Sequence, residues 1–393
     1  IINALTSCTG TGFNVTASNV TLQNMRVTDF QMAVTLSNVA NPSLTNLALT
    51  DYCLYGVRLD GSNSTIAISN TDIQTTSSTS TVGIRAGTAS AVNGMTIDGT
   101  TITSNRQGIA VYQATTPVAF DNIVIKNSTI SNNTQKGIYL EKLSNASFEN
   151  LTMDNNGTDA GYGNNNGIDI NLKYGSYSNI IIKDCDITNS GVTGTASDPQ
   201  NPAALTIKAR DDGPSYSSNP ATLSNVTIKN NRITGPQNGI RIGEYGKTNT
   251  TPTNVIIEGN DLSYAFTNKA IISRIDADIA VNCNWHGATD FPTVLTDLSE
   301  NGSGHLVLST VLNNGTDGNG AVGFQPTGTC IGPVHNITQN TYYGTIQAGV
   351  DAANANDIIE VAAGTYTEAV TVNKAVTLKG ANVGIAGTGV RGT

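Results

Sequence analysis

The 393-residue chain is acidic and sparsely charged, with 20 Lys and Arg against 29 Asp and Glu, a net charge of −9 and 12% charged residues. Globular domains carry about 25% charged residues, so this surface must consist largely of Asn, Thr, Ser and Gly. The acidic balance argues against nucleic-acid binding, which needs a basic stripe for the phosphate backbone. No apolar run approaches the ~20 residues of a transmembrane helix, so we expect no membrane span.

One short phrase recurs along the chain: a small residue, aliphatic residues at alternate positions, then a turn. It occurs at 33–36, 56–59, 83–86, 108–111, 137–140, 167–170, 204–207, 239–242 and 270–273. The mean period is about 30 residues, a size typical of solenoids, in which one supersecondary unit stacks on the next.

Each period also holds two further aliphatic patterns. A pair of alternating aliphatics, such as Ile123 and Ile125, is followed by a polar turn at Asn127 and one more aliphatic, Ile130. Alternation over so few residues indicates half-buried strands rather than a helix, and Asn tolerates the left-handed backbone of tight turns. Three short strands per period predict a parallel β-helix with an inner column of Ile, Val and Leu. A β-sandwich would show turns without a recurring three-part period.

On these repeats the chain resembles the right-handed parallel β-helix superfamily, the pectin-lyase-like group of secreted polysaccharide-active and surface proteins. The resemblance covers most of 14–280 as coils. It implies an all-β, right-handed parallel β-helix solenoid with about 30 residues per coil and one short capping-type helix near the C-terminus. The recurring residues are those that stacking needs, so the resemblance specifies the fold and says little about function.

Residues 340–393 carry a second pattern. Residues 343–353 predict a short amphipathic helix with Thr345 near its N-terminus, and 357–361 a strand. In the resembled superfamily, a capping helix followed by such segments opens a β-helix. We therefore expect coils and a closing loop over 1–310, a Gly/Asn-rich linker over 311–339, and the capping helix and opening coils of a next or permuted unit over 340–393.

Three explanations of this order stay open. The chain is one repeat length of a tandem array, which we prefer, or a circularly permuted domain, or an arbitrary segment. In the first two cases, Val376 and Leu378 are expected to contact the region of Phe13, Val15 and Val20, in the same or a neighbouring unit. No secretory leader is visible, and Ile1 indicates a processed chain or a segment.

The five cysteines are Cys8, Cys53, Cys185, Cys283 and Cys330. Cys185 lies beside coil aliphatics and is expected to be a buried free thiol. Cys283 and Cys330 flank the irregular region after the coils and are candidates for a disulfide. We expect an extracellular or cell-surface location, in a bacterium.

Charged and aromatic residues gather just after the later phrases. If neighbouring coils stack about 4.8 Å apart, they form a strip on one outer face that suits a glycan chain. The candidate ligand-binding residues are Tyr139, Asp169, Tyr174, Lys208, Arg210, Asp211, Asp212, Tyr216, Arg241, Glu244 and Tyr245. The alternative interpretation is a solvated surface on which cross-coil charge pairs neutralise one another.

Signals for catalysis are weak. The three histidines lie outside the regular coils, and His286 is expected to be a packed residue beside Trp285. Asp184 with Asp186, or Asp211 with Asp212, could bind calcium, yet no spacing specifies a site. We therefore expect no catalytic residue, no metal site and no cofactor, with calcium as the one candidate ion.

The composition and the repeats together favour a structural role. We expect a structural or adhesive module of a secreted, surface-displayed tandem-repeat fibre, associating head-to-tail with itself or with neighbouring units and contacting surface glycans. The alternative is a carbohydrate-active enzyme, a polysaccharide lyase, hydrolase or epimerase, that uses the strip at 139–247. A glycan-binding module without turnover is compatible with the first role.

Overall fold

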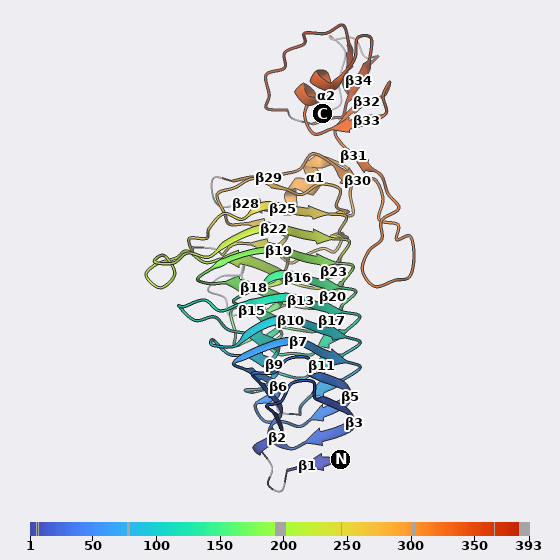
Figure 1. The fold of residues 1–393 in the computed structure, drawn as a ribbon. Coiled ribbons are helices and arrows are strands. Elements are labelled where there is room, and N and C mark those ends of the chain that lie inside the picture. Colours follow the sequence, from blue (N-terminus) through green and yellow to red (C-terminus); the bar gives the residue numbers. More distant parts are fainter. Residues whose placement is uncertain are drawn as a thin grey trace.

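The protein is a stack of coils, with three strands in each of the middle coils and two in the first and last ones (Figure 1). The computed structural model describes residues 1–384 apart from Leu5, Ser7, 77–78, 193–201, Tyr245, 301–303 and Thr365. Strands of successive coils pair in parallel, so the stack is the predicted parallel β-helix. Among the described residues, no helix is long and apolar enough to cross a membrane.

The strands of the described coils form two sheets, sheet A with 18 strands and sheet B with 11. The first strand of each coil, in sheet A, is β1 (Ile2–Asn3), β3 (Thr21–Thr28), β5 (Ser43–Thr50), β7 (Ser62–Ser69), β10 (Ala91–Asp98), β13 (Phe120–Lys126), β16 (Ser144–Glu149), β19 (Ser176–Lys183), β22 (Thr222–Lys229), β25 (Thr253–Glu258), β27 (Ile279–Ala280) or β29 (Leu306–Val307). The short strands of sheet A are β8 (Asp72–Gln74), β11 (Thr101–Thr103), β14 (Thr129–Ser131), β17 (Thr152–Asp154), β20 (Asp186–Thr188) and β23 (Arg232–Thr234).

Sheet B contains the recurring phrase. Its strands are β2 (Thr9–Val15), β4 (Phe30–Ser37), β6 (Tyr55–Asp60), β9 (Val82–Ala86), β12 (Gln107–Val111), β15 (Lys136–Leu140), β18 (Asn166–Leu172), β21 (Ala203–Ala209), β24 (Asn238–Ile242), β26 (Lys269–Ser273) and β28 (Leu298–Glu300). The remaining elements are α1 (Phe291–Thr296), β30 (Val311–Leu312), β31 (Cys330–Ile331), β32 (Val334–Asn336), β33 (Thr341–Tyr343), α2 (Ile346–Ala352), β34 (Ile358–Val361) and β35 (Thr377–Lys379).

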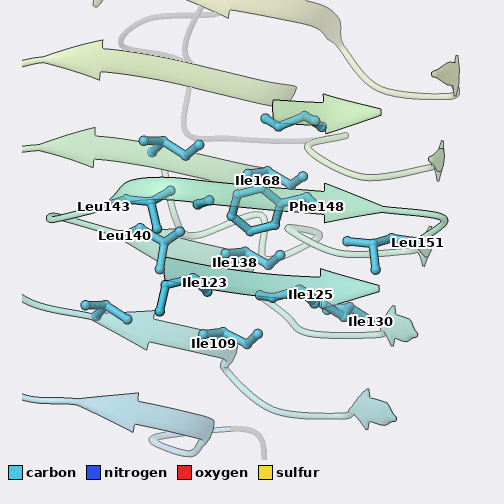
Figure 2. Close-up of a cluster of buried hydrophobic side chains, with 14 of the residues drawn as sticks. Ile109, Ile123, Ile125, Ile130, Ile138, Leu140, Leu143, Phe148, Leu151 and Ile168 are labelled. Atoms are coloured by element: carbon cyan, nitrogen blue, oxygen red, sulfur yellow. The ribbon is translucent and has the colours of Figure 1, made fainter. Parts of the chain in front are cut away.

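The core is a continuous column of aliphatic side chains between the two sheets (Figure 2). Ile125 lies in register with Ile97 on one side and Phe148 on the other, and each is at most 1% exposed. Ile138 of sheet B is fully buried and in register with Ile109 and Ile168. Burial of such side chains stabilises the fold by about 1.5–3 kcal/mol each, so the column accounts for why aliphatics recur with the coil period.

The turns carry ladders of asparagine. Asn127 has a φ of 50°, in the left-handed region, and its side chain accepts a hydrogen bond from Asn150 Nδ2 at 2.7 Å. A buried ladder includes Asn231 Nδ2 donating to Asn260 Oδ1 at 2.9 Å. Asn recurs at these turns because it adopts this backbone readily and its amide can both donate and accept between coils.

The stack closes with a helix that the sequence analysis did not anticipate. Helix α1 begins after Asp290, whose carboxylate accepts a hydrogen bond from Thr293 N at 3.0 Å. Val294 of this helix is fully buried, so α1 packs at the end of the coils.

Residues 313–329, expected to be a linker, instead fold back beside the coils and are called the strap (Figure 1). Phe324 is fully buried, and its backbone N–H donates to Asn230 O at 2.8 Å. Asp317 forms an ion pair with Arg232 of β23. At the base of the strap, β30 and β31 pair antiparallel.

The structure contains two disulfides, one at each end of the stack. Cys283 and Cys330, the expected candidates, are bonded, which fixes the base of the strap to the last coils. Cys8 and Cys53, for which no pairing was predicted, are also bonded and link the first coils. Cys185 is a buried free thiol, as expected.

Residues 332–384 form a small C-terminal unit with a hydrophobic cluster of its own, made of Val334, Val350, Ala353 and Ile359. The predicted helix is confirmed as α2, with Thr345 as its N-cap. Strand β32 belongs to this unit, so it begins before residue 340. The unit lies at the opposite end of the stack from β1 (Figure 1), so Val376 and Leu378 do not contact the first coil of the same chain. Their contact with the first coil of a neighbouring unit stays a prediction.

Candidate functional site

The predicted strip lies on the outer face of sheet B, where residues of the recurring phrase alternate away from the core. Tyr139, Asp169, Thr206 and Arg241 occupy one position in consecutive strands β15, β18, β21 and β24. Asp169, Thr206 and Arg241 have no exposed surface, and every residue of β18 and β21 is buried. This part of sheet B is therefore covered on both faces.

Asp169 is the centre of this buried row. Its Oδ2 accepts a hydrogen bond from Lys136 Nζ, and Lys136 Nζ lies 4.3 Å from the ring centre of Tyr139. Burial alone would raise the pKa of Asp169, but the positive charges of Lys136, Lys208 and Arg241 bring it to about 2. The carboxylate is therefore ionised at neutral pH, and within the described residues its Oδ1 has no hydrogen-bond partner.

A second group of charges neutralises itself at the end of β21. Lys208 Nζ lies 2.6 Å from Glu244 Oε2, and Arg210 Nε lies 2.5 Å from Asp212 Oδ1. Arg210 also approaches Glu244 at 3.8 Å. Burial raises the pKa of Glu244, but the positive charges of Lys208, Arg241 and Arg210 lower it more. The pKa of Glu244 therefore lies below its ordinary value.

The tyrosines of the strip separate into two pairs of contacts. The Tyr139 hydroxyl donates to Glu141 Oε1 at 2.6 Å, and burial together with that carboxylate raises the pKa of Tyr139. The rings of Tyr174 and Tyr216 lie 5.3 Å apart, with the Arg210 guanidinium 4.5 Å from the centre of the Tyr216 ring. Tyr245 lies outside the described residues.

A surface hollow of about 460 Å³ adjoins the strip and is lined by residues that include Glu244, Lys247, Asn249 and Arg274. Asp211 takes part in none of the ion pairs found among the described residues. The structure thus unites Lys208, Arg210, Asp212, Tyr216 and Glu244 in one cluster and leaves Asp211 beside it.

Asp186 and His286, which were considered for metal binding and for catalysis, have different surroundings. Asp186 lies 3.4 Å from Arg232 Nη1, and in the described part of the chain no group of three or more His, Cys, Asp or Glu side chains could hold a metal ion. The His286 side chain is buried, which lowers its pKa to about 4 and keeps the imidazole neutral at physiological pH.

Sequence reasoning missed the N-terminal half of the same outer face. Arg58 and Arg85 occupy the position of Tyr139 in the earlier strands β6 and β9. Tyr55 and Tyr112 flank Arg85, and Lys136 was also overlooked. The signal was present, since Arg58 and Arg85 are the third residues of phrases 56–59 and 83–86.

Comparison with known proteins identifies the fold family. The profile described as "right handed beta helix region" matches residues 1–122 and 75–210, more than half of the chain. The chain belongs to the right-handed β-helix family. This family assignment supplies the hand of the coils and confirms the predicted fold class. No curated protein and no solved structure matches the chain.

Proposed function

We propose that this right-handed β-helix protein is a structural and adhesive module of a secreted, surface-displayed fibre, in which units associate head-to-tail. A stack of coils with a continuous core resists bending because each coil contacts its neighbours over both sheets. The sparse charge and the Asn-rich turns suit a surface that is exposed along its whole length.

The observation that carries this proposal is the C-terminal unit. Strands β34 and β35 pair in parallel with Ile359 opposite Leu378, the same kind of pairing that stacks the coils. Helix α2 packs against β32, β33 and β34. A helix followed by a parallel strand pair is the arrangement with which a further β-helical unit would begin.

The ends of the molecule supply surfaces for association. Val372 is 49% exposed and Leu378 40% exposed on the C-terminal unit, while Ile1 and Ile2 are exposed beside the first coil. A strand edge at the end of a stack is a template for pairing with another chain. Contacts between unlike ends do not close on themselves, so they generate filaments rather than rings.

The charges of the strip support binding or structure more than turnover. Lys136, Lys208 and Arg210 each face a carboxylate at hydrogen-bonding distance. Charges that are already paired with one another in a buried cluster contribute little to stabilising the charge that develops in a transition state. No metal ion or cofactor forms part of this proposal.

The test of self-association changes one exposed end residue and one matched side residue. Leu378→Asp should reduce linear assembly of the full chain, measured by light scattering and electron microscopy, because it places a charge on the exposed face of β35. Ile256→Asp is the control, since Ile256 is 38% exposed but lies on the side of the stack in β25. Unchanged assembly of Leu378→Asp, or equal loss in both variants, would contradict the proposal.

A further inference from the structure

Two arginines lie side by side on the outer face of sheet B. Arg58 of β6 and Arg85 of β9 are register partners in adjacent parallel strands. Neighbouring strands lie about 4.8 Å apart, and like charges directly opposite each other destabilise a sheet. Such a pair on a chain with a net charge of −9 calls for a compensating anion.

Arg85 is held between two aromatic rings. Its guanidinium carbon lies 5.0 Å from the ring centre of Tyr55 and 5.4 Å from that of Tyr112. The Tyr112 ring is fixed in turn, because its hydroxyl donates to Gln107 Oε1 at 2.9 Å. A guanidinium stacked on rings keeps its N–H edge free, and no ion pair of Arg85 occurs within the described residues.

Arg58 supplies a second, partly neutralised guanidinium. Its Nε donates to Asp60 Oδ1 at 2.8 Å, and Nη1 approaches the Met32 sulfur at 3.5 Å. Asp60 is the one carboxylate found in an ion pair with either arginine in the part of the chain that the structure describes. Two cations and one anion leave a local positive charge.

The aromatic row continues beyond the arginines. The rings of Tyr112 and Tyr139 meet edge to face at 5.8 Å between centres. Tyr55 and Tyr112 are half-buried, so part of each ring remains open to solvent and offers apolar aromatic surface to a sugar ring. Anion-binding groups and aromatic rings therefore follow one another along the face of sheet B.

We propose that Arg58 and Arg85, with Tyr55 and Tyr112, form a binding site for a tetrahedral oxyanion carried on a glycan, a sulfate ester in particular. A planar carboxylate is satisfied by one guanidinium edge, whereas a tetrahedral group has oxygens left for a second guanidinium from the next coil. A sulfated glycan would then be the ligand of the proposed adhesive module. Only this link to adhesion rests on the proposed function.

The test measures binding of three polymers of equal length: dextran sulfate, carboxymethyl dextran with the same charge density, and dextran. Calorimetry is done on the Leu378→Asp chain, so that loss of assembly is not confused with loss of binding. We expect dextran sulfate to bind at least about tenfold more tightly than carboxymethyl dextran, and dextran not to bind.

Three variants locate the site. Arg85→Gln and Arg58→Gln should each weaken dextran sulfate binding by about tenfold or more. Arg85→Lys keeps the charge but loses the planar edge, so it should weaken binding nearly as much. Arg26→Gln is the control, because Arg26 is an exposed arginine of β3 on sheet A that is paired with Asp51 at 3.8 Å.

The polymers test the choice of ligand, and the variants test the position of the site. Equal affinity for the carboxymethyl and sulfated polymers would overturn the choice of a tetrahedral oxyanion. Equal binding by the Leu378→Asp chain with and without Arg85→Gln, or equal loss with Arg26→Gln, would overturn the site. Thermal unfolding of every variant near that of wild type shows that the fold is intact, and Arg58→Gln provides a second test if Arg85→Gln unfolds.

Discussion

Buried charges show, at the scale of single residues, how this fold accommodates polar side chains. Lys142 is fully buried, and its Nζ donates to the carbonyl oxygens of Thr88 and Ser90 at 3.3 and 2.6 Å. These carbonyls belong to the turn after β9, two coils earlier in the stack. Burial lowers the pKa of Lys142 to about 8, although Glu141 opposes the shift. The lysine therefore links the turn after β15 to the turn after β9, which lies two coils away.

Replacing Lys142 by Met should destabilise the protein by about 1–3 kcal/mol, because the buried carbonyls lose a charged donor. Urea unfolding followed by circular dichroism measures the change. Lys126→Met is the control: Lys126 is 40% exposed and pairs with Asp98 at 3.4 Å on the surface, so its loss should cost under about 0.5 kcal/mol. Equal effects of the two changes would show that the buried contacts of Lys142 contribute nothing special.

Asp169 predicts a specific acid sensitivity. Its pKa in the folded protein is about 2, below the ordinary 3.8, so the ionised carboxylate stabilises the fold above pH 3.8. That contribution disappears as the pH falls from about 4 to about 2, and it amounts to about 2 kcal/mol. The difference in free energy of unfolding between wild type and Asp169→Asn should shift by this amount over that range. A difference that stays constant with pH would show that Asp169 is not held in this way.

The strap shows what a single irregular element adds to a regular stack. Phe324 is buried at one point, the Cys283–Cys330 disulfide holds the base, and Asp317 binds Arg232. Gly315 lies against Trp285, since a Cβ added there would come within 2.1 Å of the indole Nε1. The strap thus covers part of the only tryptophan in the chain.

Removing the disulfide with the double change Cys283→Ser and Cys330→Ser should loosen the base of the strap. The emission of Trp285 should then move to longer wavelength as water reaches the indole, while the far-UV circular dichroism of the coils stays unchanged. Cys8→Ser with Cys53→Ser is the matched control, because that disulfide lies at the other end of the stack. Identical emission spectra for both double variants would contradict a covering role for the strap.

Elements that depend on local pattern could be predicted from the sequence, and elements that depend on distant contacts could not. The strands of the coils follow from aliphatic spacing and helix α2 from the Thr345 cap, although the short third strand predicted for every coil forms only in the middle ones. Helix α1 has only six residues and no repeat, and its start signal, Asp290 as N-cap with Pro292 in the first turn, was overlooked. The burial of the strip depends on how coils with insertions of different length stack, since Lys136 and Asp169 are 33 residues apart. The position of the strap depends on a contact that is more distant still, since Arg232 and Asp317 are 85 residues apart.

The molecule as a whole reads as a rod with two unlike ends. A neutralised, largely buried strip lies over β15 to β24, and the cationic, aromatic region lies over β6 to β12. The proposed binding role uses this division, because the arginines of the cationic region lie apart from the buried Asp169.

Purified protein, with or without calcium, should therefore release no new reducing ends from pectate, alginate or similar polymers, and should produce no unsaturated-uronate absorbance. A known polysaccharide lyase serves as the positive control in the same assays. Turnover that disappears on Arg210→Ala would establish the enzyme interpretation instead. Arg210 is chosen because its side chain is more exposed than that of Lys208, the other basic residue of the cluster.

The direction of the hydrogen bonds between coils has a mechanical consequence. Strands run across the long axis of the stack, so the backbone hydrogen bonds that join them point along it. Tension applied at the two ends therefore loads a few of these bonds at a time and peels coils from the ends, rather than shearing many bonds together. The Cys8–Cys53 and Cys283–Cys330 bonds cross-link the coils where such peeling would start. We therefore expect these two disulfides to raise the force at which the end coils separate.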